Sequence, residues 1–113
     1  MIKIYHNNRC SKSRNGLALL EESGKPFEVV KYLDNVPSAS ELKSIINLLN
    51  IKPIELVRKN EAIWKEKFKN KTLSDAEIIA AMVEYPKLIE RPIVINGNKA
   101  TIGRPTELIS SIL

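Results

Sequence analysis

Residues 2–20 read IKIYHNNRCSKSRNGLALL, and three patterns follow one another within them. Ile2 to Tyr5 is a short apolar run typical of a strand, and the polar residues after it are typical of a loop. Apolar residues then recur at helical spacing up to a stop signal of Gly24 and Pro26. The stretch therefore predicts a strand, a loop and a helix, with Cys10 at the start of the helix.

Apolar and polar residues alternate well enough from Phe27 to Tyr32 to predict a second strand, and the residues after this strand show helical spacing. Ser38 and Ser74 each stand three residues before a glutamate, Glu41 and Glu77, ahead of an apolar stripe. This spacing predicts two helices that begin with capping boxes, in which the serine hydroxyl accepts from the glutamate amide. Between them, residues 54–68 carry enough apolar surface for one or two shorter helices.

The C-terminal part of the chain predicts a hairpin and a last helix. Residues 93–95 and 99–102 are strand-like, and Asn96-Gly97-Asn98 between them is a strong turn signal. Gly103-Arg104-Pro105 leads into the expected helix, with proline near its start. The order is thus strand, helix, strand, several helices, two strands and a helix.

That order predicts an α/β fold with one mixed four-stranded sheet, arranged as in thioredoxin and glutaredoxin. The first strand, helix and second strand form a parallel unit, and the hairpin is antiparallel. We expect a single thioredoxin-like domain over residues 1–113, with a helical insertion at about 35–90.

The charge and composition of the chain limit the classes of ligand and partner that we expect. A net charge of +5 favours anionic ligands, but the basic residues form no dense run with aromatics, which are only 5% of the chain, so nucleic acid is not expected. No apolar stretch approaches the roughly 20 residues of a membrane span, and no signal peptide is recognisable. We expect a cytoplasmic protein without membrane partners.

The single cysteine and single histidine exclude a zinc site made by this chain alone. A lone cysteine also cannot form an internal disulfide, so any disulfide chemistry needs a thiol from another molecule.

Cys10 lies where unpaired amides of a helix N-terminus can face its sulfur, those of Ser11, Lys12 and Ser13. Such amides, with neighbouring cations such as Arg14, lower a thiol pKa and make it nucleophilic. Amides at a helix N-terminus also bind oxyanions, so the cysteine nucleophile and a bound anion would both lie at the start of this helix. The alternative interpretation is a buried, inert cysteine.

His6 and Ser13 are further candidates beside this cysteine. The His6 ring could approach the thiolate or organise the loop, or simply hydrogen-bond the backbone. Ser13 completes a Cys-x-x-Ser pattern, whose hydroxyl could donate to the thiolate but cannot resolve a disulfide.

Six short motifs resemble those of the glutaredoxin-coupled arsenate reductase family. They are Tyr5-His6-Asn7, Cys10, Ser13-Arg14-Asn15, Leu56-Val57-Arg58-Lys59, Glu90-Arg91-Pro92-Ile93-Val94 and Gly103-Arg104-Pro105. The resemblance spans nearly the whole chain, and it is greatest to short bacterial arsenate reductase-like proteins with Cys-Ser-Lys-Ser-Arg. It implies an oxidoreductase of the thioredoxin-like superfamily.

The resemblance implies that Cys10 attacks bound arsenate, that Arg58, Arg91 and Arg104 surround the oxyanion, and that His6 lowers the pKa of the thiol. Guanidinium groups suit this role because their paired donors match tetrahedral oxyanions. With no bound cofactor, glutathione as co-substrate would attack the adduct, arsenite would leave, and glutaredoxin would reduce the mixed disulfide. Arg91-Pro92 would be the cis-proline turn of the fold.

Two features depart from the family pattern. Asn8 stands where the family usually has proline, which predicts a less rigid loop. The sequence ends at Leu113, where reductases of established activity tend to continue, so part of a thiol-donor site would be absent.

Two other functions use the same residues. A general glutathione-dependent thiol-disulfide oxidoreductase needs only a reactive cysteine and a basic pocket. A non-catalytic redox regulator of the same superfamily would bind RNA polymerase, but those proteins typically carry Cys-x-x-Cys, and Ser13 stands at the second position here.

Overall fold

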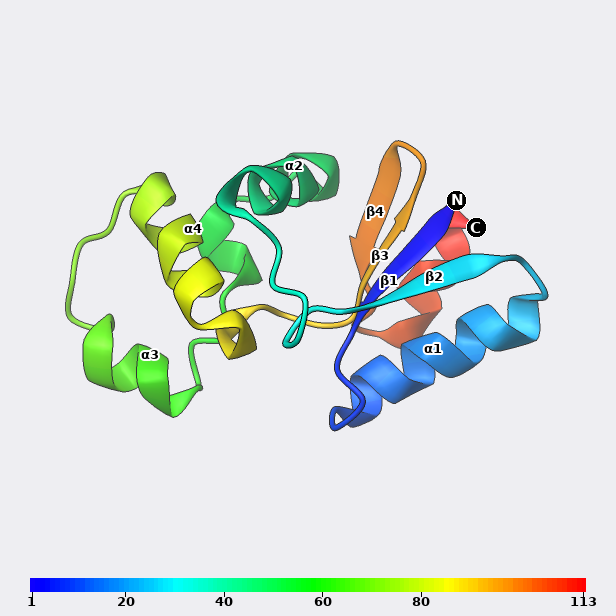
Figure 1. Ribbon diagram of the computed structural model, residues 1–113, viewed down its shortest axis with the longest axis horizontal. Helices are drawn as coiled ribbons and strands as arrows, with labels where there is room; N and C mark the ends of the chain where they lie inside the picture. Colours follow the sequence, from blue (N-terminus) through cyan, green and yellow to red (C-terminus); the bar gives the residue numbers. More distant parts are fainter. The chain divides into compact units, whose positions relative to one another are not determined.

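One mixed sheet of four strands organises the computed structural model, which describes residues 1–113 (Figure 1). The strands are β1 (Ile2–His6), β2 (Phe27–Lys31), β3 (Ile93–Asn96) and β4 (Lys99–Ile102), in the order β2-β1-β3-β4. β1 pairs in parallel with β2 and antiparallel with β3, and β3 pairs antiparallel with β4. The predicted fold class, an α/β fold with a mixed four-stranded sheet, is confirmed.

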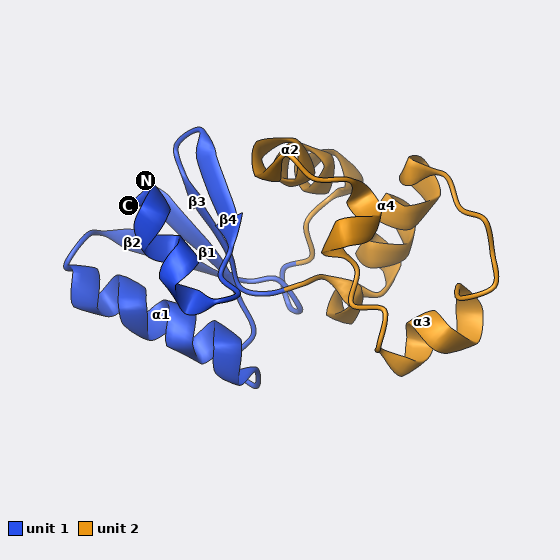
Figure 2. Ribbon diagram, turned by 180° about the vertical axis from the view of Figure 1, so that it is seen from behind, with its two compact units in different colours: residues 1–35, 91–113 blue, residues 36–90 orange.

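The chain divides into two compact units, residues 1–35 with 91–113 and residues 36–90 (Figure 2). The first contains the sheet, α1 (Ser11–Ser23) and the 3₁₀ helix η3 (Thr106–Ile112). The second is helical. Its elements are α2 (Ala39–Leu49), η1 (Pro53–Leu56), α3 (Ala62–Lys67), α4 (Asp75–Glu84) and η2 (Pro86–Leu88). None of these helices combines the length and apolar composition that a membrane crossing requires.

Local sequence signals explain where the helices begin and end. α1 ends at Gly24, whose φ of 71° lies in the left-handed region that glycine adopts without strain. Ser74 and Glu77 form the predicted capping box of α4, each side chain bonded to the other's backbone amide. At α2, the Ser38 hydroxyl accepts from the Glu41 amide at 3.1 Å.

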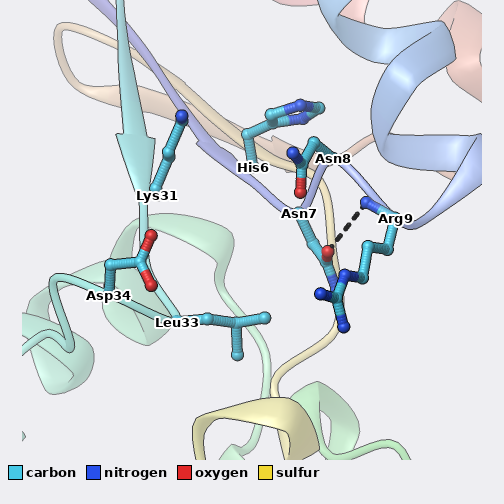
Figure 3. Close-up of a pocket in the computed structure, with 7 residues that line it drawn as sticks. All are labelled: His6, Asn7, Asn8, Arg9, Lys31, Leu33 and Asp34. Carbon is cyan, nitrogen blue, oxygen red and sulfur yellow. Dashed lines mark hydrogen bonds between the residues drawn. The ribbon is translucent and has the colours of Figure 1, made fainter.

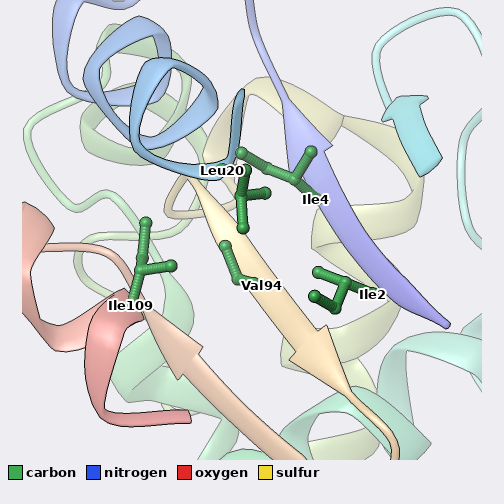
Figure 4. Packing of buried hydrophobic residues seen from close by; sticks show 5 residues of the cluster. All are labelled: Ile2, Ile4, Leu20, Val94 and Ile109. Carbon is green, nitrogen blue, oxygen red and sulfur yellow. The ribbon is translucent and has the colours of Figure 1, made fainter. Parts of the chain in front are cut away.

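The core of the first unit lies between the sheet and its helices (Figure 4). Its five buried members come from four elements brought together by the fold, β1, α1, β3 and η3, namely Ile2, Ile4, Leu20, Val94 and Ile109. Burying each such side chain stabilises the fold by about 1.5–3 kcal/mol. Because α1 supplies Leu20, this core fixes the helix that begins beside Cys10.

Two glycines allow very close packing next to Pro92, which follows a cis peptide bond. A Cβ atom on Gly16 of α1 would lie 2.9 Å from Pro92 Cγ, and one on Gly103 would lie 2.8 Å from Ile109 Cδ1. A side chain at either position would force these neighbouring groups to shift. The start of α1, the Pro92 turn and the end of β4 are therefore held together.

Two details of the C-terminal part go beyond the sequence prediction. The last helix is a 3₁₀ helix rather than an α-helix, with Pro105 as its N-terminal flanking residue. The peptide bond between Arg104 and Pro105 is cis, like that between Arg91 and Pro92.

Candidate active site

Cys10 connects β1 to α1 through a short hydrogen-bonded loop. Its extended backbone, with φ −101° and ψ 123°, makes it the N-terminal flanking residue of α1. Its amide donates to the Asn7 carbonyl at 3.0 Å, and its own carbonyl accepts from the Arg14 amide at 3.0 Å. The side chain is partly exposed, so the thiol stays within reach of a ligand.

The surroundings of the sulfur favour the thiolate. Burial raises the pKa of the Cys10 thiol, but the amides of Ser13 and Lys12 and the Arg91 guanidinium lower it by hydrogen bonding and charge. The net result is a pKa below the ordinary value. A thiol in this setting is nucleophilic closer to neutral pH than a free cysteine.

Two arginines that are distant in sequence meet this sulfur. Arg104, just after β4, donates from Nη2 to Cys10 Sγ at 3.4 Å and from Nε to the Arg91 carbonyl at 2.8 Å. Arg91, just before β3, contributes its guanidinium to the same thiolate. The two guanidinium groups thus lie together beside the Cys10 thiol, an arrangement suited to an oxyanion with several acceptor oxygens.

His6, the buried last residue of β1, contacts Ser13 at 2.7 Å from Nδ1 to Oγ. Burial lowers the pKa of His6, hydrogen bonding to the Ser13 backbone raises it, and the charges of Lys31 and Arg14 lower it, so that the pKa lies below the ordinary value. The ring is therefore neutral at pH 7, and Nδ1 can accept the hydroxyl proton of Ser13. The Ser13 hydroxyl in turn accepts from the Asn7 amide at 3.0 Å.

The two predicted candidates His6 and Ser13 are thus in direct contact, both of them buried. The hydroxyl of Ser13 is directed to His6 and Asn7, while its backbone amide faces the sulfur. This arrangement makes the pair a support for the loop that carries Cys10.

The remaining predicted residues occupy different places. Ser11, Lys12 and Arg14 are exposed on the first turn of α1, and Arg14 Nη1 donates to the Asn8 carbonyl at 3.0 Å. Arg58 belongs to the second unit, where its Nε lies 3.4 Å from Glu61 Oε2. Its place around an oxyanion stays a prediction.

Sequence reasoning did not single out Asn7 as a site residue. Its amide donates to Ser13, its carbonyl accepts from Cys10, and its side-chain Oδ1 accepts from the Arg9 amide at 3.0 Å. The bond to Arg9 forms a turn that asparagine commonly makes with the amide two residues ahead. An asparagine placed directly after a strand was the available signal.

The arrangement joins a reactive thiol, a helix N-terminus and two guanidinium groups. Such a site can attack the central atom of an oxyanion while the cations hold its oxygens. No three side chains of the types that ligate metals gather in one place.

Comparisons with known proteins agree in family and in fold. A model of the ArsC family matches residues 5–112. An arsenate reductase of Neisseria meningitidis is 46% identical over 99% of this chain and 97% of its own length. The Escherichia coli protein YfgD, whose name carries no activity, is also 46% identical, over 99% and 96%. A solved arsenate reductase from Vibrio cholerae superposes with a TM-score of 0.94 at 46% identity, covering 99% of this chain and 97% of that one.

Proposed function

This chain belongs to the ArsC family, and we propose that it is an arsenate reductase with Cys10 as its nucleophile. The observation that carries the proposal is a thiol of lowered pKa with Arg104 Nη2 at 3.4 Å from its sulfur. The relatives named arsenate reductase, 46% identical over nearly their full length, support arsenate as the substrate.

In the first step, arsenate binds with its oxygens toward the cationic groups and the Cys10 thiolate attacks arsenic. A sulfur–arsenic bond forms and one arsenic–oxygen bond breaks, and the arsenate hydroxyl leaves as water with a proton from solvent, which replaces the proton that the thiol released on ionising. Arg91 and Arg104 stabilise the negative charge on the remaining oxygens, as paired donors do for oxyanions. Ser11, Lys12 and Arg14, on the first turn of α1, belong to the proposed oxyanion site, and the family resemblance adds Arg58 as a further predicted ligand.

In the second step, the thiol of glutathione attacks the Cys10 sulfur. A disulfide bond forms, the sulfur–arsenic bond breaks, and its electron pair stays on arsenic, which leaves as arsenite with the glutathione proton. Arsenic is thereby reduced from arsenic(V) to arsenic(III), and the two sulfurs are oxidised to a mixed disulfide. Glutaredoxin then takes the glutathione by thiol–disulfide exchange and frees Cys10.

The cycle needs thiols from other molecules because Cys10 is the one cysteine of the chain, so no second thiol of the chain can resolve the adduct. His6 and Ser13 keep the loop in the conformation that directs amides at the sulfur. A cycle that depends on reduced thiols fits the cytoplasm. We also propose that residues 1–113 form a single thioredoxin-like domain, in which the helices at about 35–90 are an insertion.

The deciding experiment measures NADPH consumption by the protein with arsenate, glutathione, glutaredoxin and glutathione reductase, beside the Cys10→Ser variant. We expect turnover that requires both arsenate and Cys10. Turnover of a glutathione mixed disulfide with no response to arsenate would contradict the proposal and favour a general thiol-disulfide oxidoreductase.

A further inference from the structure

A second site lies beside the loop that carries Cys10. It is a pocket of about 390 Å³ within the first unit, lined by His6, Asn7, Asn8, Arg9, Lys31, Leu33 and Asp34. Its volume falls in the range of roughly 300–1,000 Å³ that small-molecule sites occupy. Figure 3 shows Lys31 and Asp34 on one side, with Asn8 and Arg9 facing them from the other.

The pocket lies beyond the carboxyl ends of two parallel strands. β1 ends at His6 and β2 ends at Lys31, and these two residues are paired in the register of the sheet. Open α/β sheets commonly bind ligands at this edge, because loops diverge there and leave a crevice. The position argues for a ligand site rather than a packing defect.

Charges of both signs line this pocket without neutralising one another. Arg9 and Lys31 supply two cations and Asp34 a carboxylate, and none of the three forms an ion pair within the protein. Beside Cys10, in contrast, the charged groups at the sulfur are the cations Arg91 and Arg104. A carboxylate disfavours a multiply charged oxyanion, so Asp34 makes the pocket unsuited to arsenate.

The ligand that fits such a pocket carries an ammonium group and carboxylates together. Asp34 would pair with the ammonium, and Lys31 and Arg9 with carboxylates. The amide side chain of Asn8 both donates and accepts, which suits a peptide bond. A small peptide with free ends has this set of groups.

We propose that this pocket binds the thiol donor, a small peptide thiol of the glutathione type. This inference rests on the proposed function, in which an external thiol must reach Cys10. Arg9 lines the pocket and directly precedes Cys10 in the chain, and Asn7 accepts hydrogen bonds from the amides of both residues. Donor and oxyanion would therefore approach the nucleophile from separate sites, and neither would displace the other.

The test uses S-methylglutathione, which has the peptide groups of glutathione but no free thiol and therefore cannot react. Its affinity is measured by nuclear magnetic resonance titration of the wild-type protein and of Lys31→Ala and Asp34→Ala. Lys3→Ala and Glu28→Ala are the matched controls, because both are exposed charges on β1 and β2 outside the pocket.

We expect the dissociation constant to rise about tenfold or more in each pocket variant, as loss of a charge-assisted contact predicts, and to stay unchanged in the controls. The KM for glutathione should rise in parallel, with the KM for arsenate unchanged. Wild-type affinity in both pocket variants, or ligand-induced shifts confined to residues outside the pocket, would overturn the assignment.

The two proposals fail separately. If the wild-type protein reduces arsenate but the pocket variants keep their affinity and their KM for glutathione, the pocket assignment is wrong and the function stands. If S-methylglutathione binds in the pocket and the wild-type protein leaves arsenate unchanged, the site is established and the arsenate reductase proposal is wrong.

Discussion

Arg104 Nη2 lies 3.4 Å from Cys10 Sγ, although 94 positions separate the two residues in the sequence. The same guanidinium donates through Nε to the Arg91 carbonyl at 2.8 Å. One planar group thus joins the turn before β3 to the nucleophile. A lysine could supply the charge but not both bonds, because its ammonium sits at the end of a flexible stem.

The variant Arg104→Lys should therefore lose activity although the charge is kept. A hydrogen bond to a charged group contributes about 1.5–3 kcal/mol, so we expect kcat/KM for arsenate to fall roughly 10- to 100-fold. Steady-state kinetics with the coupled glutaredoxin assay measures this loss. Wild-type kcat/KM in the variant would show that charge alone is sufficient.

The lowered pKa of Cys10 predicts the pH dependence of its alkylation. Only the thiolate reacts, so the rate with iodoacetamide should rise with pH and level off above the thiol pKa. We expect the midpoint to lie below that of a free cysteine in a short peptide measured under the same conditions. A midpoint at or above that value would mean that burial of the sulfur outweighs the amides and Arg91.

Ser13→Ala tests the support beneath the loop. The substitution leaves the Asn7 amide and the His6 ring without their buried partner, which costs about 1–3 kcal/mol of unfolding free energy. Denaturant unfolding measures this loss. Ser11→Ala, an exposed serine two positions earlier, should change stability much less, and equal losses in both variants would argue against the buried network.

Local signals were sufficient for most element boundaries. The capping box of Ser74, the glycine that ends α1 and the Asn-Gly turn before β4 each depend on residues a few positions apart. Their physics is contained in a short stretch of chain, so the sequence alone could predict them. The order of these elements then implied the mixed sheet.

The geometry of the candidate site could be predicted from the sequence only in part, because it depends on contacts between distant segments. The bond from Arg104 to the Arg91 carbonyl and the pocket between the ends of β1 and β2 arise only when the sheet forms. The sequence also did not decide which group the Ser13 hydroxyl contacts, because both the thiolate and His6 are within reach in a loop of this length. The role of Arg58, in the second unit, remains a prediction from family resemblance alone.

Because His6 is a buried histidine, we expect the free energy of unfolding to decrease in mild acid. Burial favours its neutral form, so its pKa in the folded protein is below the value of about 6.5 in the unfolded chain. The stabilisation is then complete above pH ~6.5 and declines as the pH falls through the folded-state pKa. His6 is the one histidine of the chain, so the pH dependence of unfolding in this range should weaken in His6→Asn. The same slope in both proteins would assign it to other groups.

The close packing around Pro92 connects stability to the candidate active site. In Gly103→Ala, the new Cβ would lie 2.8 Å from Ile109 Cδ1 and 3.0 Å from Pro92 Cγ, so these groups must shift. Overpacking of this kind typically costs about 1–3 kcal/mol. Because Arg104 is the next residue, we also expect its contact with Cys10 to be displaced and kcat/KM for arsenate to fall.

A second substitution separates this cause from a general loss of folding. Ile109→Val removes the Cδ1 atom that the new methyl group would meet, so the double variant should recover part of the unfolding free energy and part of kcat/KM. Ile109→Val alone leaves a small cavity in the core and should cost about 0.5–1.5 kcal/mol. If the two losses simply add in the double variant, the contact between residues 103 and 109 does not position Arg104.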